Sequence, residues 1–265
     1  MSRRLLIILA AVVVLGGLVL FGLNLNGQSQ YTNNPQLASL YEKGELIVGT
    51  DPTYPPMEFV DENDQIVGLG VDVAKEVAKE LGVKLTVEQL EWDKLFEAVN
   101  SGEVDMAISS ITITQERAET YDFSNPYFSS GQSILVLTDN NSILNPEDLA
   151  GKTVAAYYQT TSEEEAIKLV GDEGQVVTYD TDTDPVISQL TAGDIDAIIL
   201  DFPPAADAAK KHQEVKIVGD PFTSEFYGVM VKKGNSGLVS AINNTLSKIR
   251  KDNTLLELQN KWLKN

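Results

Sequence analysis

The sequence predicts a two-lobed α/β protein, and the main reason is a helix–glycine–strand unit that occurs twice. The segment Val99-Asn-Ser-Gly-Glu-Val-Asp-Met-Ala-Ile-Ser-Ser110 has a counterpart in Leu190-Thr-Ala-Gly-Asp-Ile-Asp-Ala-Ile-Ile-Leu-Asp201. In each copy a helical pattern stops at Gly102 or Gly193, and a short apolar strand typical of a buried parallel sheet follows. Two copies of such a unit in 265 residues indicate two similar lobes.

The composition is that of an acidic globular chain, and it narrows the range of partners. Twenty Lys and Arg stand against 39 Asp and Glu, a net charge of −19, which disfavours nucleic acid and anionic membrane surfaces. The chain has no Cys, so it contains no disulfide, thiolate nucleophile or thiolate metal site. We expect no cofactor and no bound metal ion.

An uncharged apolar run at the N-terminus, Leu5 to Leu23, follows Arg3 and Arg4. A helix of this length spans about 28 Å, close to the thickness of a bilayer core. The positive charges ahead of it predict a cytoplasmic N-terminus. No small-x-small cleavage site follows, so we favour an uncleaved membrane anchor over residues 1–27, with a cleaved signal as the alternative. Residues 28–39 are predicted to form a polar linker.

Polar residues follow both strands of the repeated unit. Ser110, Thr112 and Arg117 come after the first strand, and Asp201 ends the second. Ligands of open α/β sheets bind beyond the carboxyl ends of the strands. If the lobes face each other, hydroxyls and a guanidinium lie opposite a carboxylate, a layout that suits the carboxylate and ammonium of an α-amino acid. The alternative is that Arg117 is a surface residue paired with a neighbouring glutamate.

Several motifs in the right order resemble one family. They are Val48-Gly-Thr-Asp-Pro-Thr-Tyr-Pro-Pro-Met-Glu-Phe59, Ile111-Thr-Ile-Thr-Gln-Glu-Arg117, Asp122-Phe-Ser-Asn-Pro-Tyr127 and Tyr227-Gly228. Over about residues 40 to 265 the chain is similar to the polar amino-acid-binding proteins of ABC importers, extracellular solute-binding protein family 3. The resemblance implies a type II periplasmic-binding-protein-like fold, in which each lobe is a mixed sheet flanked by helices.

The resemblance also implies how the lobes and the partners are arranged. Lobe 1 is expected to comprise residues 40–132 and 226–265, and lobe 2 residues 135–222, joined by two crossing segments that act as a hinge. A monomer would capture an amino acid in the interlobe cleft, outside the cytoplasm, and deliver it to an ABC permease. Many relatives are lipoproteins held by a Cys, so here the N-terminal helix would replace the lipid.

The resemblance, with the strand-tip positions, assigns roles to ten residues. The α-carboxylate would be held by four residues: Arg117, Ser110, Thr112 and Thr161. The α-ammonium would meet Asp201, and the ligand side chain would lie between Tyr54 and Trp92. Three residues would meet the tip of the ligand side chain: Asp51, Tyr157 and Gln159. Relatives often carry Gly where Gln159 stands, which leaves the shape of that loop open, and Trp92 could instead be a core residue.

The expected ligand follows from the charges near these motifs. An acidic side chain would need a second cation, and no further Arg stands beside them. Asp51 with aromatic walls suits arginine or lysine, through a charge pair and a cation–π contact. Glutamine or another neutral polar amino acid is the alternative.

Two other classes of function stay open. An enzyme related to cyclohexadienyl dehydratase would use carboxylates in the same cleft, with Asp201 and Glu58 as candidate acids. The absence of a His or Cys from the expected cleft weakens this reading, and we expect no enzyme. The other class is a membrane-tethered amino-acid sensor.

Overall fold

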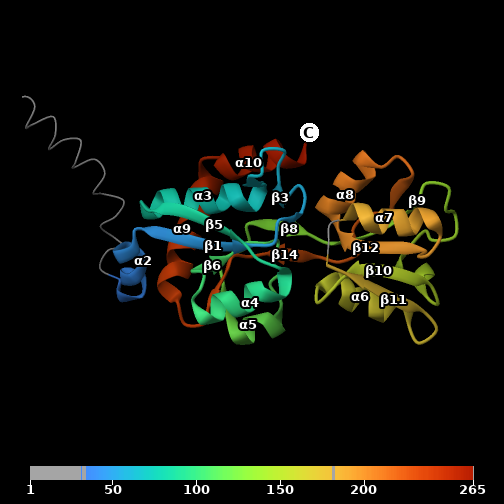
Figure 1. Cartoon of the computed structure of the whole chain (residues 1–265), viewed down its shortest axis with the longest axis horizontal. Coiled ribbons are helices and arrows are strands. Elements are labelled where there is room, and N and C mark those ends of the chain that lie inside the picture. The colour runs from blue at the N-terminus through green and yellow to red at the C-terminus, as the bar shows by residue number, and fades with distance from the viewer. Residues whose placement is uncertain (1–30, 32–33, 181–182, 265) are drawn as a thin grey trace, which may run out of the picture.

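Two α/β bodies lie side by side in this computed structural model, which describes residues 31, 34–180 and 183–264 (Figure 1). The first body contains a five-stranded mixed sheet in which β1 runs parallel to β5 and β6, while β15 runs antiparallel to β6 and β7. In spatial order its strands are β5 (Lys84–Gln89), β1 (Glu45–Thr50), β6 (Met106–Ala107), β15 (Met230–Lys232) and β7 (Tyr121–Phe123).

The second body repeats this plan. Its sheet has β10 parallel to β11 and β12, with β9 antiparallel to β12 and β13. In spatial order its strands are β11 (Gln175–Tyr179), β10 (Thr153–Tyr157), β12 (Ala197–Asp201), β9 (Gln132–Leu137) and β13 (Val215–Val218). The predicted mixed sheet in each body is therefore confirmed.

Helices cover both faces of each sheet, because each helix buries one apolar stripe against the strands. In the first body the helices are η1 (Pro35–Leu37), α2 (Ala38–Lys43), α3 (Leu69–Leu81), α4 (Trp92–Ser101), α5 (Gln115–Thr120), α9 (Ser236–Lys251) and α10 (Thr254–Leu263). In the second body they are η2 (Pro146–Leu149), α6 (Thr161–Val170), α7 (Thr183–Ala192) and α8 (Phe202–Lys211). A small antiparallel sheet in the first body contains β2 (Thr53–Tyr54), β3 (Glu58–Val60) and β4 (Ile66–Val67).

The repeated unit has the same structure in both bodies. Its helix ends at Gly102 with φ 86° and at Gly193 with φ 79°, a left-handed conformation that glycine adopts without strain. Asp105 accepts a hydrogen bond from the backbone N–H of Ile47 at 2.7 Å, and Asp196 accepts one from Thr153 at 2.9 Å. Both aspartates thus fasten the strand of their own unit to the first strand of its sheet, β1 or β10.

The chain passes twice between the bodies. Strand β8 (Phe128–Ser130) precedes β9, and β14 (Glu225–Tyr227) lies between β13 and β15. The strands β8 and β14 pair antiparallel and occupy the region between the bodies in Figure 1. The exact limits of the two lobes stay a prediction.

Part of the predicted linker is wrong. Residues 35–39 are helical, and Leu37 is buried in the core of the first body. The amide of Gln36 donates to the carbonyl of Gly234 at 2.7 Å and accepts from the N–H of Gly237 at 2.6 Å. Polar composition suggested a linker, but here the polar groups cap and bond neighbouring backbone while one leucine anchors the segment.

The predicted membrane anchor, residues 1–27, lies outside the described residues. Among residues 31, 34–180 and 183–264, no helix combines the length and the apolar character needed to cross a bilayer.

Candidate ligand-binding site

A cavity of about 780 Å³ lies between the two bodies, at the carboxyl ends of the parallel strands of both sheets. Nine of the ten predicted site residues line it: Asp51, Tyr54, Trp92, Ser110, Thr112, Arg117, Tyr157, Thr161 and Asp201. The cavity is also lined by residues that were not predicted: Thr53, Gln89, Leu90, Glu91, Asp93, Ser109, Tyr158, Thr160 and Asp180. The residues predicted from the carboxyl ends of the strands therefore lie around one cavity and form part of its lining, and their binding of a ligand stays a prediction.

The tenth predicted residue, Gln159, is not among the residues that line the cavity, and its side-chain amide donates to the hydroxyl of Tyr158 at 3.1 Å. Its carbonyl oxygen accepts from Nε1 of Trp92 at 3.1 Å, and its N–H donates to Glu163 at 2.6 Å. Its φ is 57°, the left-handed conformation that glycine adopts most easily. Gln159 therefore takes up the same kind of turn that a glycine would favour at this position.

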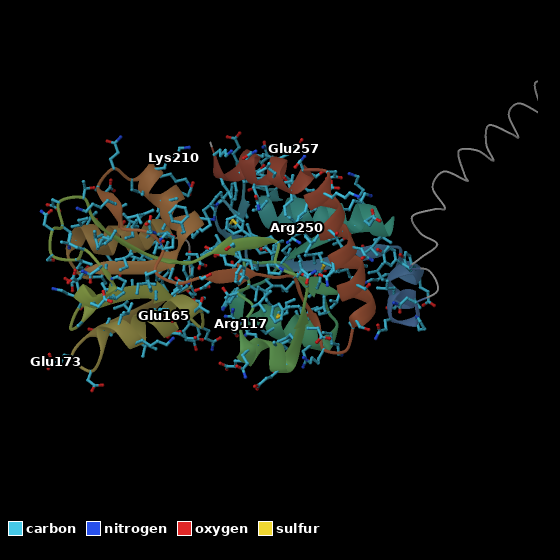
Figure 2. The ribbon with its side chains drawn as sticks, turned by 180° about the vertical axis from the view of Figure 1, so that it is seen from behind. Arg117, Glu165, Glu173, Lys210, Arg250 and Glu257 are labelled. Carbon is cyan, nitrogen blue, oxygen red and sulfur yellow. The ribbon has the colours of Figure 1, made fainter. Side chains whose placement is uncertain are left out.

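Arg117 lies at the side of the first body that is next to the second (Figure 2). Its Nη1 donates to the carbonyl of Thr112 at 3.0 Å, and its guanidinium carbon lies 5.5 Å from the ring centroid of Trp92 and 5.6 Å from that of Phe96. Burial lowers the pKa of Arg117, although nearby carboxylates oppose this. The alternative of a surface pair with a neighbouring glutamate is not seen in the described part of the chain. The remaining guanidinium donors are placed to bind an anion in the cavity.

Asp201 faces Arg117 from the second body, at the end of β12. Its carboxylate accepts from the hydroxyl of Tyr54 at 2.6 Å and from Nε2 of Gln132 at 2.7 Å. Burial, followed by the charge of nearby Glu225, raises the pKa of Asp201 to about 7. A buried carboxylate held in this way is stabilised by a cationic partner.

Among the residues that the structure describes, three hydrogen bonds connect the bodies across the cavity. Besides the bond from Tyr54 to Asp201 and that from Trp92 to Gln159, the Tyr157 hydroxyl donates to the carbonyl of Thr53 at 3.4 Å. The rings of Tyr54 and Tyr157 meet edge to face at 5.2 Å. These two tyrosines form an aromatic wall, while Trp92 lies next to Arg117.

The cavity is strongly acidic. Among the described residues that line it, five carry a carboxylate and one, Arg117, carries a basic side chain. Asp51 and Asp180 come from opposite bodies: burial chiefly raises the pKa of Asp51, and the negative charge of Asp180 adds to this. Asp93 is partnered by Lys94 at 2.9 Å on the surface. Asp180 was missed, although its place after β11, beside β10, fits the strand-tip rule.

Comparison with known proteins identifies the family. Residues 46–265 match the model of the bacterial extracellular solute-binding proteins, family 3. The chain belongs to this family. The L-cystine-binding protein TcyJ of Escherichia coli (strain K12) is 36% identical over 228 residues, covering 85% of each protein.

Solved structures agree with this family 3 membership. An arginine-bound, truncated form of ArgBP from T. maritima aligns with a TM-score of 0.75 and 38% identity, covering 80% of this chain and 99% of that one. An ancestral amino acid-binding protein, a precursor of cyclohexadienyl dehydratase, aligns with a TM-score of 0.80 and 37% identity, covering 86% and 99%. The predicted type II periplasmic-binding-protein-like fold is confirmed.

Behind the cavity lining, this family 3 protein has a buried polar layer that sequence reasoning missed, apart from Glu58. The hydroxyl of Ser110 donates to Glu58 at 2.9 Å, and Glu225 accepts from Thr112 at 2.6 Å and from Thr161 at 3.0 Å. Burial raises the pKa of Glu58 to about 8. Because Glu58 touches the cavity only through Ser110, it is not placed to act as an acid on a molecule inside it.

Proposed function

We propose that this protein captures an L-amino acid with a cationic side chain, arginine or lysine, and delivers it to an ABC permease. The observation that carries this proposal is the charge of the cavity. Among the described residues, Asp93 is paired with Lys94, which leaves four lining carboxylates, Asp51, Glu91, Asp180 and Asp201, against one guanidinium. The α-carboxylate of the ligand pairs with Arg117 and its α-ammonium with Asp201. The surplus of negative charge then calls for a second positive group on the ligand.

The α-carboxylate has a second donor group in helix α6. The first N–H groups of a helix have no partner within the helix. In α6, which starts at Thr161, the side chain of the N-cap residue Thr160 does not bond to them either. Free N–H groups and the positive end of the helix dipole bind anions. Arg117 from the first body and α6 from the second would therefore grip the carboxylate together and draw the bodies onto the ligand.

The side chain of the ligand would lie between the aromatic wall and the acidic pair. The ring centroids of Tyr54 and Tyr157 lie 5.2 Å apart, so the two rings form one aromatic surface. Asp51 and Asp180 supply carboxylates to the same cavity. A guanidinium forms forked bonds to carboxylates and stacks on aromatic rings, while an ammonium forms a more compact charge pair. These contacts favour arginine over lysine.

Glutamine and cystine are the competing ligands. The amide of glutamine can bond to Asp51 and the Tyr157 hydroxyl, but it leaves the surplus negative charge unbalanced. Cystine, which a relative binds by name, carries a second ammonium together with a second carboxylate. That carboxylate would meet Asp51 and Asp180, so the described cavity disfavours it.

Transport is favoured over catalysis and over sensing. The named relatives are binding proteins, and the place of Glu58 behind Ser110 weakens the dehydratase alternative. Incubation with prephenate or arogenate, with product followed by absorbance, would reveal such an activity. We further propose an extracytoplasmic location, with residues 1–27 as a tether. Fractionation of cells, followed by washing of the membranes with high salt, tests the tether.

Calorimetric titration of the ligand-stripped, full-length protein tests the proposed function. Arginine, lysine, glutamine, cystine and glutamate are titrated separately. We expect one site for arginine or lysine with micromolar or tighter affinity, about −8 kcal/mol. Binding of glutamine or cystine alone would overturn the cationic ligand and keep the transport proposal. No heat with any amino acid, from a sample with a cooperative melting transition, would overturn the proposed function.

A further inference from the structure

Glu225 lies beneath the floor of the cavity and bonds to both bodies at once. It begins β14 on a crossing segment and is 6% exposed, and it is not among the residues that line the cavity. Its Oε2 accepts from the hydroxyl of Thr112 at 2.6 Å and from that of Thr161 at 3.0 Å. Thr112 belongs to the first body and Thr161 to the second, and both line the cavity.

The second oxygen of Glu225 belongs to an ordered network. Its Oε1 accepts from Nε2 of Gln132 at 2.9 Å, and the same nitrogen donates to Asp201 at 2.7 Å. The carbonyl oxygen of Gln132 accepts from the Ser162 hydroxyl at 2.8 Å, which fixes the orientation of the amide. The two carboxylates and the amide are thus held in place by bonds from several elements, as buried polar groups require.

These bonds determine how the two threonine hydroxyls face the cavity. A hydroxyl has one proton to donate, and a carboxylate accepts hydrogen bonds without donating any. Because Thr112 and Thr161 both give their protons to Glu225, their oxygens can only accept further bonds. The oxygen of Thr161 already accepts one from Nε2 of Gln132 at 3.2 Å, which leaves it one lone pair for the cavity. Such oxygens accept from an ammonium and repel a carboxylate. This polarity is opposite to the carboxylate-holding role that the sequence analysis expected for these two hydroxyls.

We infer that Glu225 is a positioning residue that makes the cavity floor specific for the α-ammonium of the ligand. It acts through the hydroxyls of Thr112 and Thr161, which accept from the ammonium together with Asp201. The carboxylate of the ligand is left to Arg117 and the N–H groups at the start of α6. This inference rests on the proposed function and adds a residue that touches no ligand.

The variant Glu225→Gln tests this inference, because it keeps the shape and removes the charge. A glutamine amide has its own protons to donate, so a threonine hydroxyl that accepts one can turn its proton toward the cavity. The probes are arginine and 5-guanidinopentanoate, which has the same guanidinium and carboxylate but lacks the α-ammonium. We expect arginine to bind about tenfold more weakly or worse, since a bond to a charged group is lost, while the analogue changes by less than about threefold.

The control is Glu173→Gln, which removes a carboxylate from the exposed end of the second body (Figure 2) and should leave both affinities unchanged. Equal losses for arginine and the analogue would mean that Glu225 supports the fold alone and would overturn the inference. Unchanged binding of arginine by Glu225→Gln would overturn it as well. If the wild type binds glutamine in place of arginine, glutamine and glutaramate are the probe pair. If it binds no amino acid, the proposed function fails and the inference falls with it.

A second set of variants keeps the test valid if Glu225→Gln does not fold. Thr112→Val and Thr161→Val remove the hydroxyls without changing the shape of the side chains. We expect the pair together to weaken arginine more than the des-amino analogue. Where Glu225→Gln folds, it can be combined with Thr112→Val and Thr161→Val. This addition should change arginine affinity by less than about twofold, because the hydroxyls through which Glu225 acts are already missing. Full additivity of the effects would overturn the proposed route.

Discussion

We expect ligand affinity to depend most on Arg117, the proposed partner of the ligand α-carboxylate. Its orientation is set by the bond to Thr112 and by the rings of Trp92 and Phe96. Arg117→Ala should weaken amino-acid binding about a hundredfold or more, and Arg117→Lys about tenfold, because lysine retains the charge and loses the planar fork. Calorimetric titration measures both. The control Arg250→Lys, outside the cavity, should bind as the wild type does, and equal affinities for all three variants would contradict the role.

Ligand choice should depend on the acidic pair Asp51 and Asp180. Replacing either by Asn removes a negative charge from the end of the cavity where a cationic side chain would lie. We expect each variant to bind arginine about tenfold more weakly, since a charge-assisted bond is lost, and to bind glutamine within about threefold of the wild type. Asp93→Asn is the control, because that carboxylate is already paired with Lys94. A similar loss for both ligands would argue against a cationic side chain at this end.

The buried carboxyls predict how stability depends on pH in the ligand-free protein. Burial raises the pKa of Asp201 to about 7 and that of Glu58 to about 8, well above the values of exposed carboxyls. The folded protein therefore binds more protons than the unfolded chain between about pH 4 and 8, so stability falls as pH rises through this window. We expect a lower melting temperature at about pH 8.5 than at about pH 6. Asp201→Asn and Glu58→Gln should each flatten the slope, and an unchanged slope in both variants would contradict the assignment.

At the scale of the elements, the two aspartates of the repeated unit make similar bonds in different surroundings. Asp105 is partly buried and bonds to the N–H of Ile47 and to Lys43 at 2.7 Å, whereas Asp196 is exposed and bonds to the N–H of Thr153. Asp105→Ala should lower the free energy of unfolding by about 2 kcal/mol and Asp196→Ala by about 1 kcal/mol or less, because solvent replaces the exposed bond. Denaturant unfolding of the pair measures both, and a larger loss for Asp196→Ala would contradict this explanation.

The elements also explain what the sequence could and could not predict. The repeat around Gly102 and Gly193 is a local pattern, so it predicted both strand tips and, through them, Arg117 and Asp201. Asp180 was missed because its place in the site depends on β11 lying beside β10, a pairing that one sequence does not state. Glu225 was missed because its three principal partners lie far from it in the chain. Such non-local contacts follow from the topology of the whole molecule.

At the scale of the whole molecule, the cavity is lined by both bodies, so ligand binding depends on how the bodies and the segments that join them are arranged. The crossings carry β8 and β14, and a polar network connects Glu225, the first residue of β14, to Gln132, the first residue of β9. The three hydrogen bonds across the cavity connect the described parts of the two bodies directly. The bond from Tyr54 to Asp201 is the shortest of them, at 2.6 Å. Since Asp201 is also the proposed partner of the ligand ammonium, the same carboxylate would join closure to binding.

Because the chain has no cysteine, spin labels on introduced cysteines can test whether the two bodies close on a ligand. Spin labels on the double variant Glu119→Cys/Glu173→Cys would report the distance between the two bodies. Residue 119 is exposed on α5 of the first body, and residue 173 is exposed just after α6 of the second. We expect arginine to narrow the distance distribution, because Arg117 and α6 would hold one carboxylate between them.

Adding Tyr54→Phe should broaden the ligand-free distribution, since the bond to Asp201 is lost. The control Tyr41→Phe removes a buried hydroxyl that has no hydrogen-bond partner among the described residues and should change nothing. Identical distributions with and without Tyr54→Phe would show that this bond does not hold the bodies together.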